Sequence, residues 1–315
     1  MTNSKTKRGS VTEQEILNCQ VKDSTGLNDF QKLPEQSGLA IDKVGINRFR
    51  IPMSYPHKDG TIVNHDTIAS MYVTLASGKT GINMSRLPLI LIDETQKDSI
   101  SLAFVKNVLD RYRSELRDDK KEELIDGAFL KLRFSYPIKQ NSLMSNNWGW
   151  QYYECELEGK NIKGQFQAFL TVNYEYSSTC PCSASMARQY EQEYKDGQVQ
   201  VGTGLATAHA QRSRAKVTIQ FDPSLIYYIE DLVALLKRAI PTETQVAVKR
   251  VDEQFFAILN GEHPMFVEHA TRRLSVELNA DPKILDWVAS VEHYESLHSH
   301  NAIGVISKGL VGGLR

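Results

Sequence analysis

WGWQYYECELEGKNIKGQFQAFLTVNYEY, residues 148–176, is the stretch that decides the fold. Two strand-like runs, Trp148–Leu157 and Gln165–Tyr176, flank EGKNIKG, a segment with the composition of a hairpin turn. Two strands joined by such a short connection pair antiparallel. The stretch therefore predicts an antiparallel sheet, and with helices on one face of that sheet the predicted class is α+β.

The sequence on both sides of the hairpin alternates between strand and helix patterns. The predicted elements are strands at 68–75 and 130–136 around a helix at 100–116, then a strand at 216–221, a helix starting at Asp222-Pro223, a helix at 264–278 and a strand at 287–297. This order predicts two consecutive halves, about 36–158 and 162–315, within a single catalytic domain at 36–315. Residues 1–35 are polar and aperiodic, which predicts a flexible N-terminal arm.

The composition is that of an ordinary globular protein. Of the 315 residues 41% are hydrophobic and 24% charged, and the net charge of -1 gives no reason to expect a nucleic-acid groove. The polar start MTNSKTKRGS contains no apolar core of a signal peptide, and no apolar run approaches the roughly 18 residues that span a membrane. We therefore expect a cytoplasmic protein, in whose reducing environment a close cysteine pair is more often metal-binding or catalytic than disulfide-bonded.

Several short segments contain residues suited to chemistry. Pro181 stiffens the backbone between two thiols, and two histidines at positions 298 and 300 would share one side of a strand. The candidates are Cys180, Cys182, His209, Glu253, Glu268, His298 and His300. Each also has a structural explanation, as a buried cysteine, a hydrogen-bonded histidine or a solvated carboxylate. The residues alone leave both explanations open.

Taken in order, these segments resemble the type IB GTP cyclohydrolase family. The matching stretches are IDKVGINRFRI at 41–51, GINMSR at 81–86, TCPC at 179–182, HAQRS at 209–213, Asp252-Glu253, FVE at 266–268 and ESLHSHNA at 295–302. The resemblance implies a tunnelling fold, in which two consecutive antiparallel-sheet-plus-helix units of each chain assemble into barrels between subunits. It also implies a homotetramer with active sites at subunit interfaces, which converts GTP and water to 7,8-dihydroneopterin triphosphate and formate at the start of pterin and tetrahydrofolate synthesis.

The resemblance assigns roles to individual residues. It implies that Cys180, His209 and Glu253 bind a divalent metal, zinc or manganese or else iron, and that Glu268 binds guanine. Three protein ligands leave one metal position for the water that attacks C8 of GTP. By the same resemblance His298 and His300 lie beside the reacting ring, and Cys182 faces the substrate. The cations inside or beside the motifs are candidates for binding the triphosphate, namely Arg86, Arg212, Lys249 and Arg250.

The chain departs from the family pattern in two places. The common family motif is Gly-Thr-His-Met-Ser-Arg, and this chain has Ile82-Asn83 in place of Thr-His. Any role of the family histidine is therefore missing here. An insert at 183–208 replaces a short link, and its sequence predicts an added helix followed by a glycine-containing loop.

Two kinds of alternative stay open. The first is a repurposed or inactive relative of the same fold that binds a purine or pterin. The second comprises three other classes of protein. A nitrile reductase of the same fold acts on 7-cyano-7-deazaguanine and has a Glu-Ser-Lys-type motif, which is absent from this sequence. A zinc nucleoside deaminase needs H-x-E followed by P-C-x-x-C, and the Cys-Pro-Cys motif of this chain does not satisfy that pattern. A structural metal protein usually has four protein ligands, often cysteines, whereas one or two Cys, one His and one Glu suit an open catalytic site better.

Overall fold

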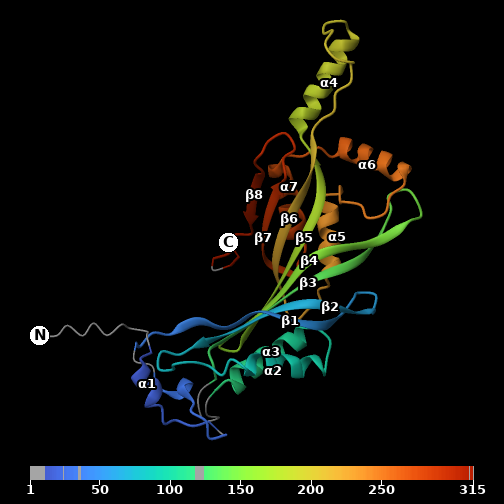
Figure 1. The fold of residues 1–315 in the computed structure, drawn as a ribbon. Coiled ribbons are helices and arrows are strands. Elements are labelled where there is room, and N and C mark those ends of the chain that lie inside the picture. Colours follow the sequence, from blue (N-terminus) through green and yellow to red (C-terminus); the bar gives the residue numbers. More distant parts are fainter. Residues whose placement is uncertain (1–10, 24, 35–36, 118–123, 312, 315) are drawn as a thin grey trace, which may run out of the picture. The chain divides into compact units, whose positions relative to one another are not determined.

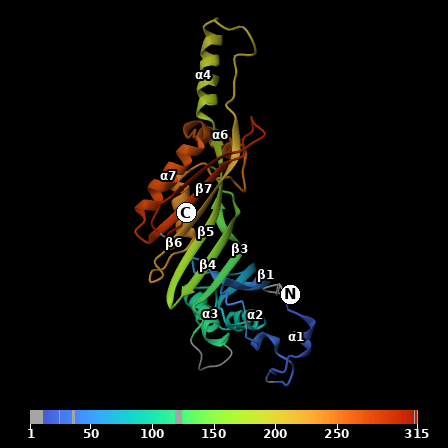
Figure 2. The same cartoon turned by 90° about the vertical axis from the view of Figure 1, so that its left-hand side faces the viewer.

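Figures 1 and 2 show the fold in the computed structural model. The structure describes residues 11–23, 25–34, 37–117, 124–311 and 313–314. The predicted N-terminal arm lies partly outside these residues; within it a helix, α1 (Glu13–Leu17), and a short 3-10 helix, η1 (Phe30–Lys32), are formed. Among the described residues, no helix has both the length and the apolar character needed to cross a membrane.

The strands form one eight-stranded sheet in which neighbours in sequence are neighbours in space. They are β1 (Ile41–Pro56), β2 (Ile62–Leu75), β3 (Gly127–Asn141), β4 (Trp148–Ile162), β5 (Gln165–Thr179), β6 (Ala210–Phe221), β7 (Ile284–His293) and β8 (Ala302–Ser307). The pairs β5–β6, β6–β7 and β7–β8 are antiparallel.

This single sheet corrects the predicted fold class. The tunnelling fold with two consecutive sheet-plus-helix units is wrong, because all eight strands belong to the same sheet. β5 pairs with β6 from Ala168 to Thr179, so the hydrogen-bonded ladder continues into the second half of the chain. A strand pattern in the sequence marks which residues form strands, but it does not show where a sheet ends.

The central hairpin is tighter than its sequence suggested. Only Lys163 and Gly164 lie between β4 and β5, and both have positive φ, at 51° and 88°. A two-residue turn with positive φ at both positions matches the twist of the flanking strands. The alternating pattern of β4 therefore continues through Glu158 to Ile162, which the prediction had placed in the turn.

Six further helices are formed in the described residues. They are α2 (Arg86–Thr95), α3 (Leu102–Glu115), α4 (Pro181–Lys195), α5 (Ile229–Ala239), α6 (Arg250–Glu262) and α7 (Val267–Ala280). The helix predicted to start at Asp222 is wrong, because the Asp222 carboxylate accepts from the Ser224 N–H at 2.9 Å and closes a turn. α5 begins only at Ile229. The last predicted strand is also shorter, since β7 ends at His293.

Contacts divide the chain into two compact units. The first contains residues 1–56, 66–132 and 158–167, and the second contains residues 57–65, 133–157 and 168–315. In the first unit α2 and α3 pack together, and the buried hydroxyl of Tyr112 donates to the carbonyl oxygen of Leu87 at 3.0 Å. α3 begins at a cap, where the Ser101 hydroxyl accepts from the Phe104 N–H at 3.0 Å.

In the second unit, α5 and α7 cover one face of the strands β5–β8 (Figure 1). The core between them includes Val217, Trp287, Leu236 and Leu274, all at most 1% exposed. Burying side chains of this size contributes about 1.5–3 kcal/mol each. This core fixes β5, β6 and β7 in register, and with them the strand ends that carry most of the candidate residues.

Candidate functional site

Two predicted metal ligands lie side by side where β5 ends and β6 begins. Thr179 pairs with Ala210 at the last position of the β5–β6 ladder, so Cys180 follows one strand and His209 precedes the other. The Cys180 N–H donates to the His209 carbonyl oxygen at 3.1 Å. The His209 N–H donates in turn to the hydroxyl of Ser183, at 3.2 Å. The two backbones are therefore clamped together by the strand ends.

The hydrogen bonds of His209 define which ring nitrogen is available. Its Nδ1 lies 3.1 Å from the side-chain oxygen of Gln211 and 3.7 Å from a carboxylate oxygen of Glu295. The Gln211 amide nitrogen donates to the Ser178 hydroxyl at 2.8 Å, which orients the amide. Both partners of Nδ1 are acceptors, so Nδ1 is engaged within the protein and Nε2 is the ring nitrogen left for a metal.

Cys180 is the N-cap of α4, and Pro181 occupies the first helical position. Proline is favoured there because its missing N–H would have no partner within the helix. Both thiols of the Cys-Pro-Cys motif are free; Cys180 is half-buried and Cys182 is exposed on the first turn of α4. The motif therefore presents two thiols at the start of a helix, where the helix dipole favours negative charge.

Glu253 lies on the first turn of α6, whose start is fixed by its neighbour Asp252. The fully buried Asp252 carboxylate accepts from the N–H groups of Met144, Ser145 and Lys249 at 2.7–2.8 Å and from the Ser145 hydroxyl at 2.6 Å. Burial favours the neutral acid, but these hydrogen bonds, that of the Ser145 hydroxyl foremost, hold the pKa of Asp252 well below its usual range.

A cavity of about 390 Å³ opens beside Glu253. It is lined by Tyr176, Ser177, Arg212, Thr244, Gln245, Val248, Glu253 and Phe256. The side-chain oxygen of Gln245 is buried and accepts no hydrogen bond. The cavity therefore offers a carboxylate, a free amide acceptor and an arginine next to apolar walls, as small-molecule sites often do.

The three predicted metal ligands do not gather into one cluster. In the part of the chain that the structure describes, no three His, Cys, Asp or Glu side chains lie close enough together to hold a metal ion. Cys180 and His209 adjoin each other, whereas Glu253 is exposed and lines the cavity on α6. The donor types suit a divalent metal, and the three-residue site stays a prediction.

Glu268 lies on the first turn of α7 and is exposed to solvent. α7 packs against β7, which contains one member of a buried pair, His293 and Tyr176, that the sequence did not reveal. His293 is 2% exposed, and its Nε2 lies 2.9 Å from the hydroxyl of Tyr176, which is fully buried. Burial lowers the pKa of His293 to about 4, against an opposing effect of the Glu268 charge. In the sequence, His293 falls on the buried face of the predicted strand at 287–297. This position could have indicated a buried polar pair, but the strand pattern is also that of an ordinary core residue.

His298 and His300 lie in the connection between β7 and β8, because β7 ends at His293. The expectation that a strand would hold them is therefore wrong. Their exposed rings nevertheless stack, with centroids 4.9 Å apart and an interplanar angle of 10°. Two imidazoles do meet at one spot, on a loop that starts directly after the buried His293.

Three of the predicted phosphate-binding cations lie in the second unit. Arg212 is exposed, lines the cavity beside Glu253 and has its guanidinium 3.8 Å from the Glu175 carboxylate. Lys249 is the N-cap of α6 and Arg250 its first residue, both exposed. The positive end of this helix adds to their charge.

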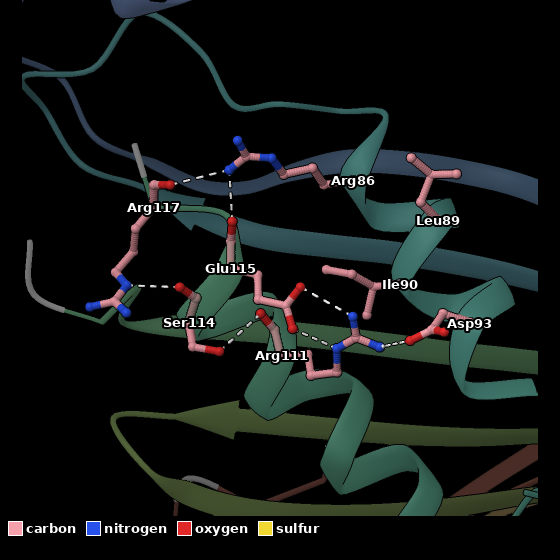
Figure 3. A pocket seen from close by; sticks show the side chains of 8 residues that line it. All are labelled: Arg86, Leu89, Ile90, Asp93, Arg111, Ser114, Glu115 and Arg117. Atoms are coloured by element: carbon pink, nitrogen blue, oxygen red, sulfur yellow. Dashed lines mark hydrogen bonds and ion pairs between the residues drawn. The ribbon is translucent and has the colours of Figure 1, made fainter. Parts of the chain in front are cut away.

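Arg86 lies in the first unit, at a cavity of about 730 Å³ shown in Figure 3. One guanidinium nitrogen donates to the carbonyl oxygens of Glu115 at 2.7 Å and Arg117 at 3.2 Å, at the end of α3. The neighbouring Arg111 is held by the carboxylates of Glu115 and Asp93. In the first unit Arg86 thus caps α3, and a role in binding phosphate stays a prediction.

The insert at 183–208 has the predicted form, a helix followed by a glycine-rich loop. α4 has no buried residue and extends away from the strands β5 and β6 that flank it (Figures 1 and 2). The loop folds back onto it, since the Tyr190 hydroxyl donates to the Val201 carbonyl at 2.6 Å and accepts from the Gly204 N–H at 3.1 Å. Gly202 and Gly204 have positive φ, and a Cβ on Gly202 would lie 2.3 Å from that hydroxyl.

Comparison with known proteins identifies the family. A family model described as type I GTP cyclohydrolase folE2 matches residues 27–304. A protein of Dinoroseobacter shibae named GTP cyclohydrolase FolE2 is 39% identical over 94% of this chain and 78% of its own length. Another of that name, from Paracoccus denitrificans, is 39% identical over 85% of this chain and 78% of its own.

Among solved structures, a uricase from Arthrobacter globiformis covers 87% of this chain and 95% of its own, with a TM-score of 0.49 and 7% identity. A similarity of that degree supports no statement about activity. The sequence matches extend over nearly the whole chain and include every segment that contributes a candidate residue. The chain therefore belongs to the type I GTP cyclohydrolase FolE2 family.

Proposed function

We propose that this GTP cyclohydrolase converts GTP and water to 7,8-dihydroneopterin triphosphate and formate, at the ends of β5, β6 and β7. The activity follows from the family, which acts in folate biosynthesis. The observation that favours this location is the clamped pair of Cys180 and His209, in which Nδ1 of His209 contacts Gln211 and Nε2 is the nitrogen available to a metal. The loop with His298 and His300 follows the end of β7 beside the start of β6. The segment before α7 adjoins the end of β5, since the Met265 N–H donates to the Thr179 carbonyl oxygen at 2.9 Å.

We further propose that Cys180, His209 and Glu253 hold a divalent metal ion. A thiolate, an imidazole and a carboxylate suit zinc and also accept manganese or iron. Bound by three ligands, such an ion would keep one position for water and lower the pKa of that water toward about 7. The contacts of Gln211 and Glu295 with His209 Nδ1 would hold the ring in the required orientation.

The guanine base would bind at Glu268. Guanine presents N1–H and the 2-amino group side by side, and one carboxylate accepts from both. Glu268 is exposed on the first turn of α7, where the helix dipole stabilises its charge. In this proposal the base is fixed at a rigid helix start and its imidazole ring is directed toward the strand ends.

Exposed side chains around the strand ends would transfer protons and bind the phosphates. His298 or His300, stacked on the exposed β7–β8 connection, would move a proton at the opened ring, and Cys182 would face the substrate from α4. Arg212, Lys249 and Arg250 would neutralise the triphosphate, with the N-terminus of α6. Arg86 would join them only if it exchanged its carbonyl partners for phosphate.

We also propose that the active form is a homo-oligomer, and that it is a tetramer. Glu253 is not gathered with Cys180 and His209 in the described residues of a single chain, so contacts between subunits would complete the ligand set. The exposed Ile303 and Val305 on β8 are residues of an edge strand that a second copy could cover.

Single substitutions test the metal site. Cys180→Ala, His209→Ala and Glu253→Ala should each lower the metal content of the purified protein and abolish formation of neopterin from GTP, measured by fluorescence after oxidation. Glu295→Ala serves as the control, because loss of an orienting partner should weaken metal binding without abolishing it. Full metal content and activity in Glu253→Ala would remove Glu253 from the proposed ligands.

A further inference from the structure

Tyr176 and His293 form a buried pair directly behind the candidate site. Both residues pair with Ser213 of β6, Tyr176 from β5 and His293 from β7. Strands two apart in a sheet are separated by about 9.6 Å, twice the usual spacing of neighbours. The small, fully buried Ser213 leaves room above the sheet, where the Tyr176 hydroxyl meets His293 Nε2 at 2.9 Å.

Each member of the pair lies next to a different part of the proposed active site. Tyr176 lines the cavity that contains Glu253. His293 ends β7, just before the loop that carries the stacked histidines, and β7 packs against α7, whose first turn carries Glu268. The hydrogen bond between them therefore connects the wall of the cavity with the strand that packs against α7.

Both groups stay uncharged at neutral pH. Burial lowers the pKa of His293 to about 4 and raises the pKa of the Tyr176 hydroxyl far above its usual value. A neutral imidazole next to a carboxylate neither neutralises it nor forms an ion pair with it.

We propose that Tyr176 and His293 are positioning residues for the reaction, which hold the start of α7, and with it Glu268, in the place that recognises guanine. The inference rests on the proposed role of Glu268. The hydroxyl of Tyr176 fixes the ring of His293, and β7, which ends at this ring, packs against α7. Neither residue contacts the reacting atoms, and both act through Glu268.

The test compares two tyrosines on one strand. Tyr176→Phe removes only the hydroxyl and should raise KM for GTP about tenfold. A factor of ten corresponds to roughly 1.4 kcal/mol, which is the free energy expected for one lost hydrogen bond. The metal content should not change. Tyr174→Phe is the matched control: Tyr174 is equally buried on the same face of β5, but its hydroxyl donates to the Ile240 carbonyl at 2.7 Å, at the end of α5. The Tyr174→Phe substitution should lower Tm and leave KM for GTP unchanged.

Two further comparisons separate positioning from general stability. His293→Gln keeps an acceptor for the Tyr176 hydroxyl and should retain a KM nearer the wild type than His293→Leu does. In a Glu268→Gln background, Tyr176→Phe should have little additional effect on KM, because both changes act on the same contact. Equal KM values for Tyr176→Phe and Tyr174→Phe, or equal values for His293→Gln and His293→Leu, would overturn the inference.

These results distinguish this inference from the proposed function. A wild-type protein that makes no neopterin from GTP would contradict the proposed function itself. An active wild type in which Glu268→Gln leaves KM unchanged would remove both the guanine anchor and the positioning role that depends on it. An active wild type with a functional anchor and an unaffected Tyr176→Phe variant would remove the positioning role alone.

Discussion

At the scale of single residues, Glu268 has the most specific role of the proposed site. Its carboxylate is exposed at the start of α7, so its function can be changed with little effect on packing. Cys180 and His209 differ in this respect, because their backbones also close the β5–β6 ladder. A substitution that keeps the size of Glu268 therefore separates recognition from folding most cleanly.

Glu268→Gln should weaken recognition of GTP far more than it weakens folding. The amide accepts from only one of the two guanine donors and directs its own NH₂ at the other. The expected loss in kcat/KM is about 2–4 kcal/mol, from a charged hydrogen bond that is broken and left unpaired. Steady-state kinetics with GTP measure the loss, and thermal unfolding should show a nearly unchanged Tm. Unaltered kinetics would exclude Glu268 from the site.

At the scale of elements, the start of α6 depends on one buried carboxylate. Asp252 accepts four hydrogen bonds from residues 144, 145 and 249, and these fix the turn that presents Glu253. Because the pKa of Asp252 is lower in the folded than in the unfolded protein, its contribution to stability is present above the unfolded value, about 3.9, and is lost as the pH falls below it.

Asp252→Asn should therefore lower Tm at pH 5–8, and the difference from the wild type should shrink below about pH 4. Metal content and activity should fall together with Tm if the first turn of α6 loosens. Glu262→Gln is a suitable control on the same helix, because it removes an exposed carboxylate at the C-terminal end of α6, away from the N-terminal turn. A Tm difference that stays constant from pH 3 to pH 7 would contradict the assigned role of the Asp252 charge.

A helix or strand can be predicted from the sequence when one of its faces is buried, because its apolar residues then recur at a regular spacing. β4 and β5 were predicted because their residues alternate between buried and exposed positions. α6 was missed because Asp252 is its only buried residue, so it shows no apolar stripe. Asp222-Pro223 resembles a helix start but forms a turn. In both a helix N-cap and such a turn, the Asp carboxylate accepts a hydrogen bond from a backbone N–H two or three residues later.

The sequence named the candidate residues one by one, and those roles stay predictions, but it did not show how the residues are arranged. The adjacency of Cys180 and His209 depends on the register of β5 against β6, and the contact of Tyr176 with His293 spans a third strand. Register is set by tertiary packing, so a single sequence does not reveal it. Short motifs pointed to the candidate residues, whereas Tyr176 and His293 have the sequence pattern of ordinary core residues.

At the scale of the whole molecule, the question is whether one chain suffices for a site. In the described residues Cys180 and His209 adjoin each other without a third ligand, which favours completion by assembly. Two inactive variants, Cys180→Ala and Glu253→Ala, should regain part of the wild-type activity when they are unfolded, mixed and reassembled, if a site takes ligands from different subunits. Light scattering gives the size of the assembly. A fully active monomer would contradict the shared site.

The central claim is that this chain opens the imidazole ring of GTP and releases C8 as formate. The most direct measurement follows GTP labelled with ¹³C at C8 by NMR, with purified wild-type protein, with the metal removed by a chelator, and with Cys180→Ala. The account predicts that the label appears in formate with the wild type, that it stays in the purine in both other samples, and that added zinc or manganese restores the chelated enzyme but not the variant. Label that remains in the purine with metal-loaded wild-type protein, or formate released equally by Cys180→Ala, would contradict it.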